Sequence, residues 1–234
     1  MISQAPSGLA FAAAKWREFP TTAHPRPLVL TSKPVGVGTF VTGDARAAVE
    51  AGLLGVEDSV PAAAVDAMRR AGLVRSDHSE SQTRVMSATP SSMGFGTDRG
   101  GRQLPAWLLS ITGIDGICYV MDAESQASAY PSTESVTSVH PLGGYARLLG
   151  DGLTVRVDFK PPWLTRDAAA ASTAVDVLET DSSVAFGPSV GGAAAGDANT
   201  EAVTFRLVAP LGARVLCDVG GSPVVVARRK RNGR

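Results

Sequence analysis

The most regular pattern of hydrophobic and polar positions lies in residues 145–160. Over 153–160 the two kinds of residue alternate strictly, and the apolar set is Leu153, Val155, Val157 and Phe159. A β-strand with one buried and one solvated face requires this alternation, because successive side chains point to opposite faces. Asp151 and Gly152 precede the strand and suit the positive φ angles of a type I′ turn. The segment therefore predicts an antiparallel hairpin.

Shorter runs of β-branched and aromatic residues predict further strands along the chain. The expected strands cover 26–31, 104–112, 117–121, 173–180, 183–186, 203–207, 214–217 and 224–227. Many short strands with short connections are typical of a sandwich or a barrel. We therefore predict a mainly β fold, an antiparallel β-sandwich or barrel-like domain with two short helices near the N-terminus.

The two helices are predicted over 45–54 and 61–71. Asp44 has the residue type of an N-cap for the first helix. Pro61 suits the first turn of the second helix, and Gly72 suits its end. Both helices precede the main series of strands.

Composition along the chain predicts three parts. Residues 1–20 are expected to form a flexible N-terminal arm, although its aromatic residues would be able to dock on the body of the protein. Residues 21–227 are expected to form a single β-rich domain. Residues 228–234 form a basic C-terminal tail with five cations. Long loops rich in Ser, Thr, Gly and Ala are expected over 124–138 and 187–199.

The charge balance argues against a nucleic-acid partner. The chain of 234 residues has 22 Lys and Arg against 22 Asp and Glu. Because the tail holds five of the cations, residues 1–227 carry 17 basic and 22 acidic groups. A nucleic-acid surface needs clustered cations. The tail itself is either a solvated end or a contact for phosphate or anionic lipid.

No targeting or membrane-spanning segment is predicted. No apolar run approaches the roughly 20 residues that cross a bilayer as a helix. The N-terminus lacks the order of cations followed by a long apolar stretch that marks a signal peptide. A soluble protein in the cytoplasm is therefore the default expectation.

The candidates for chemistry are few. His78 lies among serines and carboxylates in a polar segment and has the residue type of a general base, and His140 is a second candidate. Asp122 and Glu124 are two positions apart at a strand end, a spacing that would let both carboxylates face one hard cation. No motif for a cofactor or a metal occurs, so the sequence predicts neither.

Cys118 and Cys217 each lie in an apolar, strand-like stretch. They are either two buried thiols that act as small hydrophobic side chains or one disulfide in an oxidising compartment. Two cysteines alone do not complete a four-ligand zinc site.

Several short segments resemble a loosely defined group of uncharacterised β-rich proteins and lipoproteins from actinobacteria. The matching segments are Arg26-Pro27-Leu28-Val29-Leu30, Gly43-Asp44-Ala45, Thr97-Asp98-Arg99-Gly100, Leu104-Pro105-Ala106-Trp107, Asp151-Gly152-Leu153-Thr154-Val155 and Ala209-Pro210-Leu211-Gly212-Ala213-Arg214-Val215. The resemblance implies a β-rich fold and an exported or envelope location, and it brings no catalytic residue. This chain departs from the group because it shows no leader and no lipid-bearing cysteine near its start.

Three hypotheses for the function follow. The first is a non-enzymatic β-sandwich module that binds a protein or a cell-envelope component through long loops, since binding residues commonly lie on loops. The second is a hydrolase whose site assembles only in the fold, with His78, His140 and the carboxylates as first candidates. The third is a structural subunit of a larger assembly, with edge strands or the basic tail making the contact.

Overall fold

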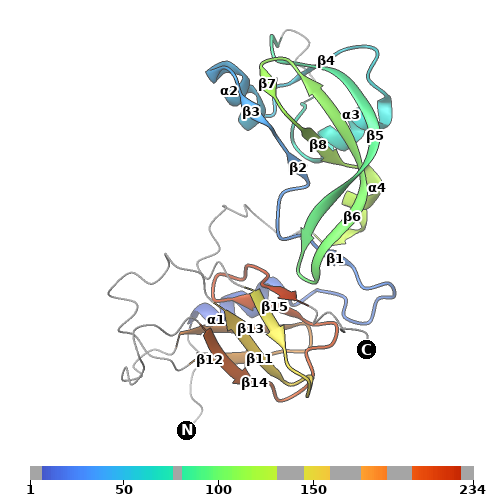
Figure 1. The fold of residues 1–234 in the computed structure, drawn as a ribbon. Coiled ribbons are helices and arrows are strands. Elements are labelled where there is room, and N and C mark those ends of the chain that lie inside the picture. Colours follow the sequence, from blue (N-terminus) through green and yellow to red (C-terminus); the bar gives the residue numbers. More distant parts are fainter. Residues whose placement is uncertain (1–6, 76–80, 131–144, 159–174, 189–201, 228–234) are drawn as a thin grey trace, which may run out of the picture. The chain divides into compact units, whose positions relative to one another are not determined.

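The computed structural model describes residues 7–75, 81–130, 145–158, 175–188 and 202–227. Two of the predicted site residues, His78 and His140, lie outside these ranges, and so does the basic tail. Strands dominate, as the alternating patterns predict, and they form several sheets (Figure 1).

The chain divides into two compact units. The terminal unit takes its residues from Met1–Thr31, Thr97–Gly100 and Tyr130–Arg234, and the central unit takes Ser32–Gly96 and Gly101–Ala129. The sequence predicted one β-rich domain over 21–227, and both boundaries of the central unit fall inside that range.

The first sheet of the terminal unit has four strands in the order β14-β11-β10-β16. The strands are β10 (Tyr145–Leu148), β11 (Thr154–Asp158), β14 (Ala202–Arg206) and β16 (Val225–Ala227). Strand β11 is antiparallel to β10 and β14, whereas β16 is parallel to β10. The predicted hairpin is confirmed as β10–β11, with Ala146 opposite Val157.

The turn of this hairpin is longer than predicted. The N–H of Leu149 bonds the carbonyl of Thr154, which leaves residues 150–153 as a four-residue connection. Asp151 orders it, because its Oδ1 accepts from the N–H of Leu153 at 3.0 Å and of Thr154 at 2.8 Å. A type I′ turn would have only two residues between the paired positions. The local bonds of the aspartate side chain favour the wider turn.

The second sheet of the terminal unit has three strands in the order β12-β13-β15. They are β12 (Val175–Glu179), β13 (Ser183–Pro188) and β15 (Val215–Asp218). Strand β13 is antiparallel to β12 and parallel to β15. Both sheets supply one hydrophobic core, in which Ala146, Val155 and Val157 of the first sheet join Val184, Phe186 and Leu216 of the second. This shared core is the sandwich-like feature of the fold.

Helix α1 (Ser7–Lys15) packs on the other face of the second sheet, where a flexible arm had been expected. The reason is a helical period that the sequence analysis did not use. Leu9, Ala12, Ala13 and Trp16 follow the i, i+3, i+4, i+7 spacing of one helix face, and all four are buried. Trp16 and Phe19 dock as anticipated, while Phe11 remains 57% exposed. The arm prediction was therefore wrong over the helix.

Aromatic side chains join α1 to a small two-stranded sheet. This sheet pairs β1 (Leu28–Val29) with β9 (Ala129–Tyr130). The rings of Phe19 and Tyr130 meet edge to face with centroids 5.1 Å apart, and Trp16 lies within 6.0 Å of Phe19. Such pairs stabilise a core beyond the area they bury.

The central unit is built on a sheet in the order β2-β8-β6-β5-β4. Its strands are β2 (Val35–Gly36), β4 (Gly55–Val56), β5 (Arg84–Thr97), β6 (Gly100–Ile111) and β8 (Cys118–Met121). A separate pair joins β3 (Thr39–Phe40) and β7 (Ile114–Asp115). The long hairpin of β5 and β6 dominates this unit (Figure 1), and its turn, Thr97–Gly100, is grouped with the terminal unit.

The two predicted helices are confirmed as α2 (Gly43–Ala51) and α3 (Ala62–Arg70). The N-cap of α2 is Thr42 rather than Asp44, and its hydroxyl accepts from the N–H of Ala45. Asp44 lies instead in the first turn, where a negative charge favours the positive end of the helix dipole. A further helix, α4 (Ala123–Ser128), begins the segment predicted as a long loop.

Both cysteines are free and buried. Cys118 is 2% exposed and Cys217 is fully buried, so the alternative of buried thiols holds in this structure. Burial, with the neighbouring Asp218 carboxylate as a second cause, raises the pKa of Cys217 far above its ordinary value. No helix within the described ranges is long and apolar enough to cross a membrane.

Candidate functional site

The carboxylate pair predicted as a candidate site caps a helix. Asp122 is the N-cap of α4, and its Oδ1 accepts from the N–H of Ser125. Glu124 lies in the first turn of the same helix. Both placements stabilise a helix start, because they set negative charge beside unpaired N–H groups. Within the described residues, no group of three or more candidate metal ligands gathers here or elsewhere.

The structure instead brings charged residues together around the connection from β14 to β15, residues 207–214, here called the clamped loop. Leu207 and Leu211 are buried and anchor it to the core. Val208, Ala209 and Pro210 lie between these anchors and are exposed. Val208 is 92% exposed, the highest value among the large hydrophobic side chains of the described residues.

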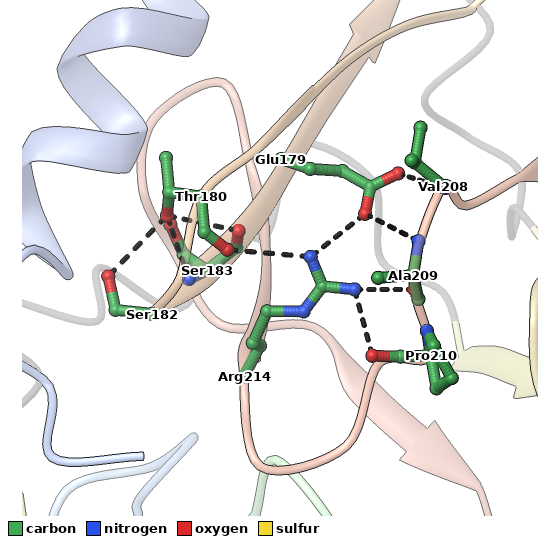
Figure 2. A network of polar contacts seen from close by, with 8 residues as sticks. All are labelled: Glu179, Thr180, Ser182, Ser183, Val208, Ala209, Pro210 and Arg214. Atoms are coloured by element: carbon green, nitrogen blue, oxygen red, sulfur yellow. Dashed lines mark hydrogen bonds and ion pairs between the residues drawn. The ribbon is translucent and has the colours of Figure 1, made fainter.

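Glu179, at the end of β12, fixes the start of the clamped loop. Its carboxylate accepts from the N–H groups of Val208 and Ala209 (Figure 2). Its Oε2 also accepts from Nη1 of Arg214 at 2.8 Å. The side chains of Glu179 and Arg214 are only 16% and 11% exposed, so this ion pair is largely removed from water.

Arg214 binds the same stretch of backbone through its carbonyls. Its Nη2 donates to the carbonyl oxygens of Ala209 at 2.6 Å and of Pro210 at 2.9 Å (Figure 2). The planar guanidinium presents its donors in a rigid fork, which sets the direction of each bond as well as its length. Within this ion pair, Glu179 therefore binds N–H groups of the loop and Arg214 binds carbonyl groups.

A second charged cluster fixes the end of the clamped loop. Arg99 donates to the carbonyls of Gly212 at 3.0 Å and Arg214 at 2.6 Å, and Arg26 donates to the carbonyl of Ala213 at 2.7 Å. Both guanidiniums form ion pairs with Asp98, whose side chain is 1% exposed. The two clusters together bind most of the backbone polar groups between residues 208 and 214.

Competing effects set the ionisation of Glu179. Desolvation is the largest and raises its pKa, but the N–H of Val208 and the guanidinium of Arg214 together outweigh it. The net result is a pKa below the ordinary value of 4.5, so the carboxylate is charged at neutral pH. The clamp is therefore fully formed under physiological conditions.

Hydroxyl groups order the turn beside Glu179. Thr180 Oγ1 lies 3.0 Å from Ser183 Oγ and accepts from the N–H of Ser183, also at 3.0 Å (Figure 2). Because these hydroxyls bond each other and the backbone, they serve the turn between β12 and β13. No base that would activate a nucleophile is bonded to them in the described part of the chain.

One sequence motif falls partly outside the described residues. Residues 187–191 have the Gly-x-Ser-x-Gly spacing of a nucleophile elbow, a match that the sequence analysis missed. Its serine, Ser189, is not among the described residues. Gly187 has its own structural reason, because a Cβ there would lie 2.0 Å from Cγ1 of Val219.

Sequence reasoning missed the clamped loop as a site, although its parts were visible. Arg26, the turn 97–100 and the segment 209–215 are all short motifs that stand out in the sequence. Glu179, the carboxylate that pairs with Arg214, was not predicted. It lies 35 positions before Arg214, and no local pattern links the two.

Comparisons of the chain with models of known protein families, with curated proteins and with solved structures gave no match.

Proposed function

We propose that this protein is a non-enzymatic binding module that recognises a partner protein through the clamped loop. The observation that carries the proposal is Val208, a 92% exposed apolar side chain on a backbone held by the Glu179–Arg214 ion pair. Two further exposed residues, Ala209 and Pro210, extend this apolar tip.

A preformed loop favours binding for an entropic reason. A flexible loop loses conformational freedom when a partner orders it, and this loss weakens the complex. The clamped loop has already lost that freedom, since several of its N–H and carbonyl groups are bonded to Glu179 and Arg214, which are largely removed from water. Supporting bonds of this kind are what hold a recognition surface in one geometry.

The described carboxylates favour a module over a hydrolase. Asp122 caps a helix, Glu179 binds the clamped loop, and Asp98 pairs with two arginines. Each has a structural task, and no specific observation assigns any of them a catalytic one. An envelope partner, a role as a subunit of an assembly and the actinobacterial resemblance stay predictions.

The proposal is tested by a substitution that places a charge at the tip of the clamped loop. Val208→Asp adds a carboxylate at a side chain that packs against little, so its free energy of unfolding should stay within about 0.5 kcal/mol of the parent protein. Binding to the partner should be lost, because burial of an unpaired charge opposes complex formation. Immobilised parent and variant are compared for the proteins that each retains from an extract of the source cells.

Ile117→Asp is the matched control, since Ile117 is a 66% exposed apolar residue of the central unit. We expect a protein that the parent and Ile117→Asp retain and Val208→Asp does not. Equal retention by all three proteins would contradict the role of the loop. Reproducible hydrolysis of model esters or peptides by the purified chain would contradict the non-enzymatic assignment.

A further inference from the structure

The outward face of the first sheet carries a group of arginines next to the clamped loop. Because Ala146, Val155 and Val157 point into the core, the alternating residues of these strands point outward. The register places Arg147 opposite Arg156 and Thr154 opposite Arg206. The outward set on these adjacent strands therefore includes Tyr145, Arg147, Arg156 and Arg206, together with Thr154, Asp158, Ala202 and Thr204.

Among the described residues, two carboxylates bind the three arginines of this face. Asp158 accepts from Arg147 at 3.2 Å and from Arg156 at 2.9 Å, and Asp151 accepts from Arg206 at 3.2 Å. The three arginine side chains stay 66%, 53% and 68% exposed, respectively. A guanidinium has five N–H donors, so one carboxylate contact leaves donors on each that point to solvent. The aspartates fix the guanidiniums in place without saturating them.

This face is continuous with the clamped loop. Arg206 is the last residue of β14, and the N–H of Leu207, the first residue of the loop, donates to the carbonyl of Leu153, the residue just before β11. Two positions separate Arg206 from the exposed Val208.

The composition of the face fits a protein partner. Arginine and tyrosine are enriched at protein interfaces and lysine is depleted, and the described residues of this face include three arginines, one half-exposed tyrosine and no lysine. The surplus of guanidinium groups is complementary to carboxylates. We infer that this face binds an acidic segment of the partner whose apolar site receives the clamped loop. The inference rests on the proposed function for the identity of the partner.

The test uses the full chain and a fluorescently labelled oligoglutamate peptide as the probe. Binding is followed by fluorescence anisotropy at low and at physiological salt. The variant is Arg147→Ala with Arg206→Ala, which leaves Arg156 to pair with Asp158. We expect its dissociation constant to rise by about threefold to tenfold, because exposed charge contacts are individually weak. The salt dependence of binding should fall as well.

The matched control is Arg46→Ala with Arg70→Ala, which removes two exposed cations from the central unit. We expect its affinity to stay close to that of the parent protein. An equal loss in both double variants would overturn the inference, as would binding that depends only on residues 228–234 when these are deleted. Tighter binding of oligothymidylate or of phosphatidylglycerol vesicles to the same arginines would also overturn it.

Failure of this inference is distinguishable from failure of the proposed function. Val208→Ser removes the apolar tip without adding a charge, so it should leave binding of the oligoglutamate peptide unchanged while it weakens retention of the partner. The arginine variant should weaken retention of the partner and peptide binding together. Retention that depends on Val208 but not on the arginines would remove the inference alone.

Discussion

The clamped loop and the Asp151 turn are two connections of the same unit, and they are fixed in opposite ways. The Asp151 turn, residues 150–153, is ordered by one side chain whose backbone partners lie two and three positions away. The clamped loop is ordered by Glu179 and Arg214, which are 35 positions apart in sequence, and by Arg26 and Arg99 from still more distant segments. One connection can form locally, and the other forms only when the whole unit has folded.

The two connections also differ in their exposure to water. Asp151 and its partner Arg206 are 39% and 68% exposed, whereas Glu179 and Arg214 are 16% and 11% exposed. Screening by solvent keeps an exposed ion pair weak, while loss of one partner from a desolvated pair leaves the other charge without compensation. Substitutions in the clamp should therefore have larger effects than substitutions in the turn.

The largest effect is expected from Glu179→Ala. It leaves the Arg214 guanidinium largely buried without a counter-charge, and it frees the N–H groups of Val208 and Ala209. The free energy of unfolding should fall by about 2 kcal/mol. Urea unfolding followed by circular dichroism measures this change.

The control for this substitution is Asp66→Ala. Asp66 and Arg70 form an ion pair one helical turn apart, and both are more than half exposed. Its loss should change the free energy of unfolding by no more than about 0.5 kcal/mol. If the two variants lowered the free energy of unfolding by similar amounts, burial of the Glu179–Arg214 ion pair would have no energetic consequence.

As the pH is lowered, the two connections should weaken at different pH values. Both carboxylates have a folded-state pKa below the ordinary value, so each stabilises the fold above its ordinary pKa and ceases to do so as pH falls. For Asp151, whose side-chain and backbone bonds from Thr154 lower the pKa to about 2, the loss occurs between about pH 4 and pH 2. For Glu179 the loss of stability begins at a slightly higher pH, near the ordinary carboxyl pKa of 4.5.

Urea unfolding across this range of pH tests the separation. Relative to the parent protein, Glu179→Ala should show a shallower decline of stability where the loss begins. Asp151→Ala should show a shallower decline between about pH 4 and pH 2. Identical curves for the two variants would mean that the two carboxylates are not in different environments.

The smallest effect is expected from Asp151→Ala at neutral pH. It removes local bonds from a turn at the surface, and the strands on either side remain paired in the sheet. The melting temperature should fall by less than for Glu179→Ala. Asp181→Ala, in the exposed turn between β12 and β13, is the control and should leave the melting temperature unchanged. If Asp151→Ala lowered the melting temperature as much as Glu179→Ala does, the expected difference between the two connections would be wrong.

The same difference explains what could be predicted from the sequence. The β10–β11 hairpin and helices α2 and α3 were predictable because alternation, capping residues and glycines act between neighbours. Even there, Thr42 and not Asp44 is the N-cap, since the choice between two cap residues only two positions apart depends on the backbone path. Helix α1 is predictable on the same local ground, because Leu9, Ala12, Ala13 and Trp16 follow the helical period.

The contacts that hold the clamped loop could not be predicted from the sequence, and the physical reason is a different one. Asp98 and Arg26 are separated by 72 positions in the sequence, yet in the folded unit Nη2 of Arg26 lies 2.6 Å from Oδ2 of Asp98. Charged residues in a sequence look alike whether they become solvated or buried. The segments around Arg26, Asp98 and Arg214 are visible in the sequence, but their contact is a property of the folded unit.

The burial of both native thiols has a practical consequence. Cys118 and Cys217 are shielded from solvent, and a raised pKa keeps Cys217 from ionising. A maleimide reacts with accessible thiolate, so the native protein should resist it. A cysteine introduced by Val208→Cys would then be the one position to take a fluorophore or a cross-linker, with no need to remove either native cysteine.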